Sequence, residues 1–234
     1  MKQNRENPFF ETYRTPFGTP PFDQIETEQY EPAFDEGIWQ LDEEVRAIAD
    51  NTELPTFENT IIALERSGKL LDKVISAFFN VLNAEADDEM MDISQRVSPK
   101  LSESSNNIYL NEQLFARVKS VYDRKDELHL PMEDARLLEK TFEAFCARGA
   151  ALGPEEKEKY RKLSSELSLL SLTFDQNALK DKNRYELLLT KEDELEGLPE
   201  SIREAAALRA KEKGKTGWLF NLCLLYTSDA ADDS

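Results

Sequence analysis

Apolar residues recur at spacings of three and four along most of this 234-residue chain. The first clear series consists of Tyr30, Phe34, Ile38, Leu41, Val45 and Ile48. This spacing places apolar side chains on one face of a helix, whereas a half-buried strand would alternate apolar and polar residues. Because the helical spacing returns in segment after segment, the sequence predicts an all-α fold built from several amphipathic helices.

Residues suited to begin or break helices separate these segments. Thr56 and Asn111 each stand just before an apolar series, where a side-chain oxygen can accept a hydrogen bond from the first turn. The acidic run 85–89 precedes a helix expected at about 88–108, and its negative charge suits the positive end of the helix dipole. Pro99 lies inside that helix, and we expect it to kink or break the helix at a cost of ~3 kcal/mol.

The longest helical pattern begins at Gly153 and Pro154. Its apolar positions are Tyr160, Leu163, Leu167, Leu170, Phe174 and Ala178. A helix of about 25 residues would be ~37 Å long, and the apolar repeat is shorter than the three to four heptads typical of a coiled coil. We therefore expect this stripe to pack inside the domain.

The segments divide the chain into three predicted regions. Residues 1–26 form an irregular, proline-rich arm, whose aromatic side chains favour packing against the helices because burial of each is worth ~1.5–3 kcal/mol. Residues 27–217 form the helical domain, whose last helix is expected at about 199–213. Residues 218–234 begin as a strand that would lack sheet partners. The tail from Cys223 resembles translated read-through of a sequencing adapter.

The net negative charge of the chain argues against some classes of binding partner. The formal net charge is −18 and the sequence pI is about 4.6, so the chain repels nucleic-acid phosphates and anionic membrane surfaces. We expect no nucleic-acid partner and no membrane partner. The N-terminus has no apolar run typical of a secretory signal, and this predicts a cytoplasmic location. Cys146 and Cys223 are far apart and are interpreted as reduced structural residues.

Catalytic motifs are absent from this sequence. The chain contains one histidine, His129, so the motif H-E-x-x-H cannot occur. His129 lies between two leucines before a proline and is interpreted as a surface or loop-packing residue. The glycine-rich phosphate loop, the dinucleotide fingerprint and the serine-hydrolase elbow are missing too. The sequence therefore predicts no catalytic, cofactor-binding or metal-binding residue in this chain.

Several stretches resemble one known family in their order and spacing. They include Pro-Phe-Asp-Gln-Ile at 21–25, Tyr-Glu-Pro-Ala-Phe-Asp-Glu-Gly at 30–37, Pro-Thr-Phe-Glu-Asn-Thr-Ile at 55–61 and Asn-Ile-Tyr-Leu-Asn at 107–111. Together they are similar to the thimet oligopeptidase family, in its peptidyl-dipeptidase (dipeptidyl carboxypeptidase) and oligopeptidase A branch. The resemblance spans about residues 7–220.

The resemblance implies a fold and a function. The fold would be the multi-helix N-terminal half of a neurolysin-like structure, in which two halves enclose a deep channel. The parent polypeptide would be a zinc metallopeptidase that cleaves short peptides, as a peptidyl-dipeptidase or an oligopeptidase. Its zinc would be held by H-E-x-x-H and a downstream glutamate, positions that this sequence does not contain. This chain would then wall the channel, bind no zinc and be inactive alone.

A non-catalytic, acidic helical binding module is the alternative. Such a module would hold a partner through its acidic surface or through the apolar stripe of the longest helix. The two hypotheses differ in what a longer reading frame should encode.

Overall fold

A computed structural model of the chain describes residues 7–85 and 87–221. The tail assigned to adapter read-through lies outside these residues. The predicted all-α fold is confirmed, and two short strands accompany the helices. The elements are α1 (Tyr30–Ala49), α2 (Ala63–Glu65), α3 (Lys69–Glu85), α4 (Asp88–Tyr109), α5 (Glu112–Tyr122), α6 (Met132–Ala147), α7 (Pro154–Arg184), β1 (Leu187–Leu189), α8 (Glu200–Glu212) and β2 (Trp218–Phe220).

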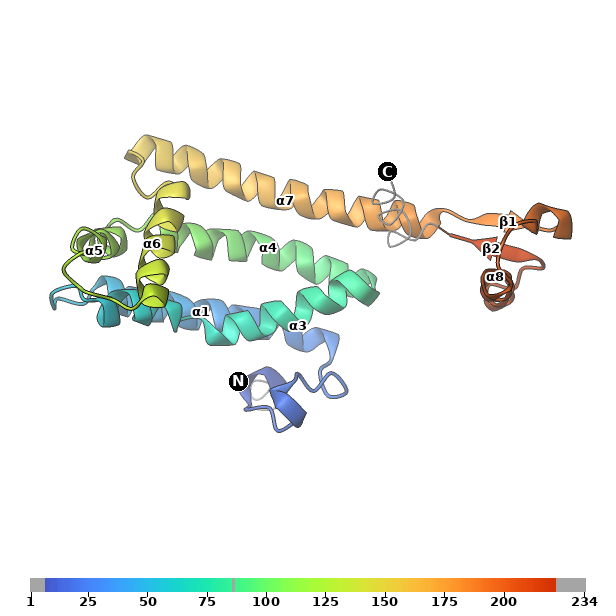
Figure 1. Cartoon of the computed structure of the whole chain (residues 1–234), viewed down its shortest axis with the longest axis horizontal. Helices are drawn as coiled ribbons and strands as arrows, with labels where there is room; N and C mark the ends of the chain where they lie inside the picture. Colours follow the sequence, from blue (N-terminus) through green and yellow to red (C-terminus); the bar gives the residue numbers. More distant parts are fainter. Residues whose placement is uncertain (1–6, 86, 222–234) are drawn as a thin grey trace. The chain divides into compact units, whose positions relative to one another are not determined.

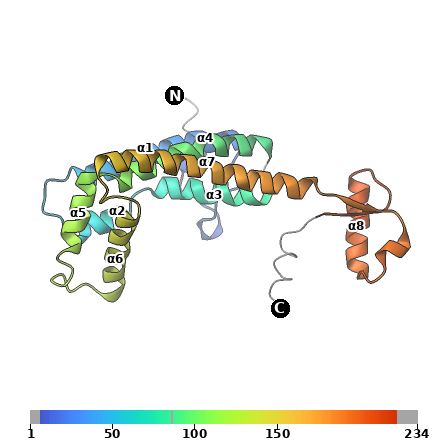
Figure 2. The ribbon, with the colours of Figure 1, turned by 90° about the horizontal axis from the view of Figure 1, so that it is seen from above.

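The chain divides into two compact units, Met1–Leu172 and Thr173–Ser234, called unit 1 and unit 2 below. Within unit 1, α1 packs against both α3 and α4. Helices α5 and α6 contact each other at one end of these long helices, as Figures 1 and 2 show. The domain limits expected at residues 26 and 217 remain a prediction.

Unit 1 contains two apolar cores. In the first, the rings of Phe34 and Phe78 meet edge to face with centroids 5.2 Å apart, and both residues are 0% exposed. Gly37 permits the close approach of α1 to α3 there, because a Cβ at this position would lie 3.0 Å from the Cα of Leu71. The second core joins α1, α5 and α6 around Ile61, Leu114, Val118 and Leu138.

Local signals placed several helix ends correctly. Thr56 Oγ1 accepts a hydrogen bond from Asn59 N at 3.1 Å, and Asn111 Oδ1 accepts one from Leu114 N at 2.9 Å. Of the two outcomes expected at Pro99, a kink or a break, the break does not occur, since α4 continues through Pro99 to Tyr109. Proline removes one backbone donor from a helix interior, and the burial of α4 against α1 offsets that loss.

The N-terminal arm is tied to unit 1 by one buried ring and one lysine. Phe9 is 1% exposed and belongs to the first core, with its ring centroid 5.2 Å from that of Tyr30. Lys73 Nζ of α3 donates to the carbonyl oxygens of Phe9 at 2.8 Å and Glu11 at 2.7 Å. The ammonium also lies 3.7 Å from the centroid of the Tyr13 ring. By contrast, Phe17 is fully exposed.

Unit 2 is a small α/β arrangement. Strands β1 and β2 pair antiparallel, with Leu188 opposite Leu219. The strand expected at Trp218 is therefore present, but the expectation that it has no sheet partner is wrong. Its partner, β1, lies almost thirty residues earlier and was not recognised in the sequence. Gly217 is required beside this pair, because a Cβ there would lie 2.3 Å from Leu189 O.

No helix in the described part of the chain is long and apolar enough to cross a membrane.

Candidate functional site

Two concavities on unit 1 are candidate sites, and the first carries the chain's single histidine. It has a volume of about 790 Å³ and lies beside the loop that joins α5 to α6. His129 is exposed there, at a backbone φ of 48°. The neighbouring polar residues, such as Asp126 and Arg136, are exposed as well. Because His129 and most of the polar groups around it are exposed, this concavity lacks the desolvated environment that tunes a catalytic acid or base.

The second concavity is a groove of about 390 Å³, lined by α4 and α7 with contributions from Phe79 and Arg148. It is rich in hydroxyl groups, from Ser98, Ser102, Ser105, Tyr160, Ser164 and Ser168. A nucleophilic serine needs an adjacent base, and the only histidine lies at the other concavity. Arg148 packs its guanidinium 4.1 Å from the centroid of the Tyr109 ring. The groove is therefore a polar contact surface between helices.

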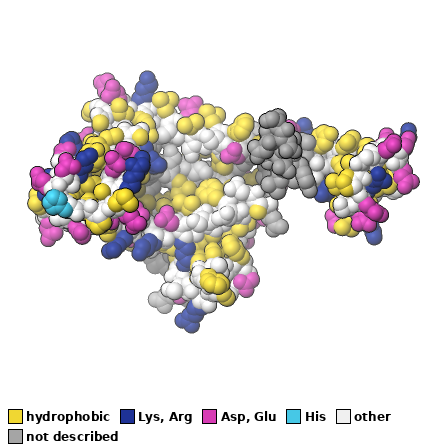
Figure 3. Space-filling model, viewed as in Figure 1, with side chains coloured by type: hydrophobic (Ala, Val, Ile, Leu, Met, Phe, Trp, Pro, Cys, Tyr) yellow, Lys and Arg dark blue, Asp and Glu magenta, His cyan; other side chains and the backbone are white. Residues whose placement is uncertain are grey.

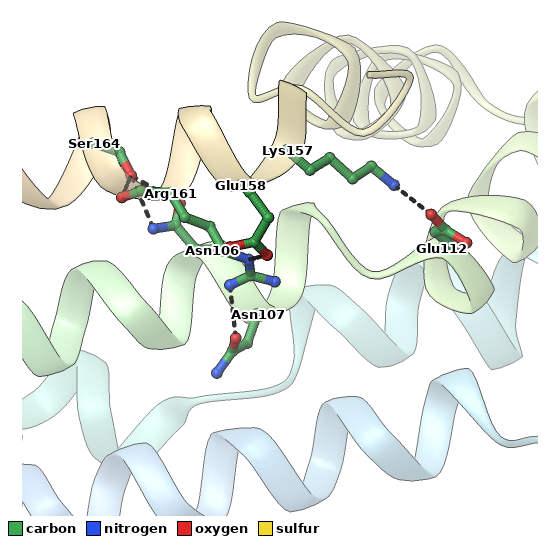
Figure 4. A network of polar contacts seen from close by, with 7 residues as sticks. All are labelled: Asn106, Asn107, Glu112, Lys157, Glu158, Arg161 and Ser164. Atoms are coloured by element: carbon green, nitrogen blue, oxygen red, sulfur yellow. Dashed lines mark hydrogen bonds and ion pairs between the residues drawn. The ribbon is translucent and has the colours of Figure 1, made fainter. Parts of the chain in front are cut away.

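Polar side chains fasten the first half of α7 along this groove, as Figure 4 shows. Lys157, which is 8% exposed, forms an ion pair with Glu112 of α5 at 3.1 Å. Arg161 Nη1 donates to Asn107 Oδ1 at 2.9 Å, and Asn106 Nδ2 donates to Ser164 Oγ at 2.8 Å. These contacts lie on one side of α7, and they fix which face of the helix is turned toward α4.

The apolar stripe of α7 is left on the surface. Leu163, Leu167 and Leu170 are 56%, 64% and 59% exposed. The expectation that this stripe packs inside the domain is therefore wrong. The polar contacts to α4 occupy a different face of the helix, so the leucines project away from the groove. In Figure 3 yellow apolar side chains are visible along the upper edge of unit 1, where Figure 1 places α7.

Ion pairs join α1 to α4 at another part of the same unit. Arg96 contacts Glu31 at 2.9 Å, and Lys100 contacts Asp35 at 2.6 Å. The hydrogen bond that Arg96 donates lowers the pKa of the Glu31 carboxyl, and the hydrogen bond that Lys100 donates to Asp35 raises the pKa of Lys100. Each shift stabilises the charged form of a paired group, so this cluster is interpreted as structural.

A buried cation was missed by the sequence reasoning. Arg117 of α5 is 7% exposed, and its Nη1 donates to the carbonyl oxygens of Asn51 at 2.5 Å and Glu53 at 3.0 Å. Its Nη2 donates to Asn59 Oδ1 at 3.0 Å. These acceptors lie in or just after the loop that follows α1. Arg117 therefore holds that loop in place, and no sequence motif marks the role.

Relatives with known names match most of this chain. A dipeptidyl carboxypeptidase of Escherichia coli (strain K12) is 40% identical over 217 residues, which are 92% of this chain and 32% of the relative. A dipeptidyl carboxypeptidase of Salmonella typhimurium (strain LT2) is 37% identical over 89% of this chain and 31% of the relative. An oligopeptidase A of Haemophilus influenzae is 27% identical over 88% of this chain. None of the protein-family models compared with the chain matches it.

The chain is a partial-length homologue of the thimet oligopeptidase family. The family predicted from the sequence is thus confirmed, because the relatives that match this chain are dipeptidyl carboxypeptidases and oligopeptidases A. This chain spans about a third of the length of the curated relatives that it matches.

The residues of this chain offer few of the ligands that a catalytic zinc site needs. The chain's single histidine cannot supply two zinc ligands. Among the described residues, no group of three or more His, Cys, Asp or Glu side chains is placed to hold a metal ion. The described residues therefore do not fit a catalytic zinc site, and the expectation that no residue of the chain binds metal or is catalytic stays a prediction.

Proposed function

We propose that this chain is the N-terminal, channel-walling part of a cytoplasmic zinc peptidase that hydrolyses short peptides. The observation that carries the proposal is the similarity to a dipeptidyl carboxypeptidase over 92% of this chain and 32% of that relative. The oligopeptidases A support a peptide substrate as well. The zinc and the residues that activate its bound water are assigned to the rest of the parent polypeptide.

Within this proposal, the helical surface of unit 1 restricts access. A rigid wall of packed helices beside an active site excludes folded substrates and admits extended ones. The two apolar cores of unit 1 and the buried Arg117 hold its helices and loop together, which supports such a wall. The parent enzyme is then either a peptidyl-dipeptidase or an oligopeptidase.

The proposal is tested first on the chain alone. An internally quenched peptide, offered with added zinc, should not be hydrolysed by the purified 234-residue chain. Chelator-sensitive turnover by this chain would overturn the assignment of the catalytic residues to another part of the polypeptide.

The longer reading frame distinguishes the peptidase from a free-standing binding module. We expect the genomic frame to continue for several hundred codons and to encode H-E-x-x-H. A frame that stops near Ser234 without this motif would favour the acidic binding module instead.

A further inference from the structure

The central part of α7 has a composition unlike that of a solvent-facing helix. Residues 163–172 read Leu-Ser-Ser-Glu-Leu-Ser-Leu-Leu-Ser-Leu, with Glu166 as the one charged side chain. In the chain as a whole, 32% of residues are charged. A helix exposed on one side normally carries charged or polar residues there, whereas apolar residues form the face that is covered.

Three of the five leucines in this segment form a continuous strip. At 100° per residue, Leu163, Leu167 and Leu170 lie within about 60° of one another around the helix axis. All three are more than half exposed. We call these three residues the α7 stripe. Serines 164 and 168 lie on another face, where they line the groove with α4.

The contacts of unit 1 leave the α7 stripe uncovered, whereas another face of the helix has polar partners. Lys157, Arg161 and Ser164 each have a partner on α4 or α5. Three neighbouring leucines in water are unfavourable, because each would gain by being removed from solvent. Exposed apolar surface of this contiguous kind marks a contact with another protein surface.

We infer that the α7 stripe docks on an apolar surface of the remaining, catalytic portion of the parent peptidase. The inference rests on the proposed function and names the contact between its two parts. This occupant is favoured because the chain covers only about 32% of a relative that matches it over 92% of its own length. The relatives thus contain a large additional part, able to cover this surface. A strip without lysine or arginine also fits an uncharged partner better than an acidic one.

The test compares the same substitutions in two settings. Leu163→Gln, Leu167→Gln and Leu170→Gln are combined, because glutamine favours helix nearly as well as leucine and removes the apolar surface. One setting is the 234-residue chain. The other is a chimera in which this chain replaces the matching segment of the Escherichia coli dipeptidyl carboxypeptidase.

The triple variant is expected to change the Tm of the chimera more than the Tm of the isolated chain. The triple variant should lower the Tm of the chimera by several degrees and leave the Tm of the isolated chain within about 2 °C, since surface substitutions change stability little. A control that combines Leu54→Gln and Leu208→Gln removes leucines that are 68% and 58% exposed, away from α7, and should produce no such difference. An equal loss in both settings, or no loss in the chimera, would overturn the inference.

A photo-crosslinker at position 167 of the chimera gives a second readout that does not depend on stability. Crosslinks should join α7 to peptides of the catalytic portion within one polypeptide. Crosslinks confined to peptides of this chain, or a crosslinked dimer, would contradict the inference. If the isolated chain forms a tight dimer in sedimentation that the triple variant abolishes, the stripe belongs to a second copy and the inference fails.

The chimera separates this inference from the proposed function. A chimera that hydrolyses peptides but shows neither the Tm difference nor the crosslinks would retain the function and exclude the docking surface. A folded chimera that shows both but hydrolyses nothing would retain the docking surface and exclude the function.

Discussion

Unit 1 and unit 2 are stabilised to different degrees by their apolar cores. Unit 1 buries large side chains such as Phe34, Phe78 and Leu114, each 0% exposed. The buried apolar residues described in unit 2 are Leu195, Ala206, Ala210 and Leu219, of which two are alanines. Since burial of apolar surface is the main favourable term in folding, unit 1 should set the cooperative stability of the chain and unit 2 should open more readily.

The largest expected effect is a cavity in the first core of unit 1. Phe78→Ala should reduce the free energy of unfolding by about 3–5 kcal/mol, because Phe78 touches several rings and leaves a large void. Denaturant unfolding followed by far-UV circular dichroism measures this loss. The control, Phe17→Ala, removes a fully exposed ring and should change little. Similar losses for both variants would contradict the core assigned to unit 1.

The buried cation of α5 should rank second. Arg117→Met leaves the carbonyl oxygens of Asn51 and Glu53 without their donor, at a cost of about 2–4 kcal/mol. Arg117→Lys keeps the charge but not the forked donors, so it should recover only part of the stability. The same unfolding titration compares both variants. A methionine variant as stable as the original chain would show that the guanidinium does not hold this loop.

A change in the core of unit 2 should have a smaller and more local effect. Leu219→Ala truncates a side chain of β2 that is 1% exposed, next to α8, and should cost about 2 kcal/mol, at the low end for a buried leucine because the core of unit 2 contains few large side chains. Hydrogen exchange should accelerate at the amides of β1 and β2 and stay unchanged in α3 and α4. Equal acceleration in α3 would indicate that the two units unfold together.

The weakest expected effect is a dependence of unit 2 on pH. Hydrogen bonds from Lys213, and then from Lys215, hold the pKa of Glu186 at about 2 instead of the ordinary 4.5. The ionised carboxylate is therefore stabilised by folding. Its contribution should be complete above pH 4.5 and disappear as the pH falls toward 2.

Glu186→Gln isolates this contribution from those of the other carboxyl groups. The difference in hydrogen-exchange protection of β1 between the original chain and the variant should shrink as the pH falls from 4.5 toward 2. A difference that is constant across this interval would show that the ion pairs of Glu186 do not stabilise unit 2.

Local chemistry made much of unit 1 predictable from the sequence. The caps at Thr56 and Asn111 act within one helical turn, so three or four residues contain the whole signal. The pairing of β2 with β1 was missed because the partner strand is distant in sequence and only three residues long. Pro99 misled the prediction because its effect within the helix is local, while the burial that keeps α4 intact comes from α1.

The surroundings of the α7 stripe and of Arg117 were less predictable from the sequence than the helices themselves. Periodicity identified the apolar face of α7 correctly but could not say what covers it. The scarcity of charge in residues 163–172, where Glu166 is the one charged residue, was visible in the sequence. Arg117 had no comparable signal, because its acceptors are backbone carbonyls of a loop more than sixty residues away.

Peptide hydrolysis by the chimera tests the central claim most directly. We expect a chimera carrying this chain in place of the matching segment of the Escherichia coli dipeptidyl carboxypeptidase to hydrolyse a quenched peptide, and a chelator to abolish the activity. The isolated chain should remain inactive under the same conditions. A correctly folded, zinc-loaded chimera without peptidase activity would contradict the claim that this chain forms part of a peptidase.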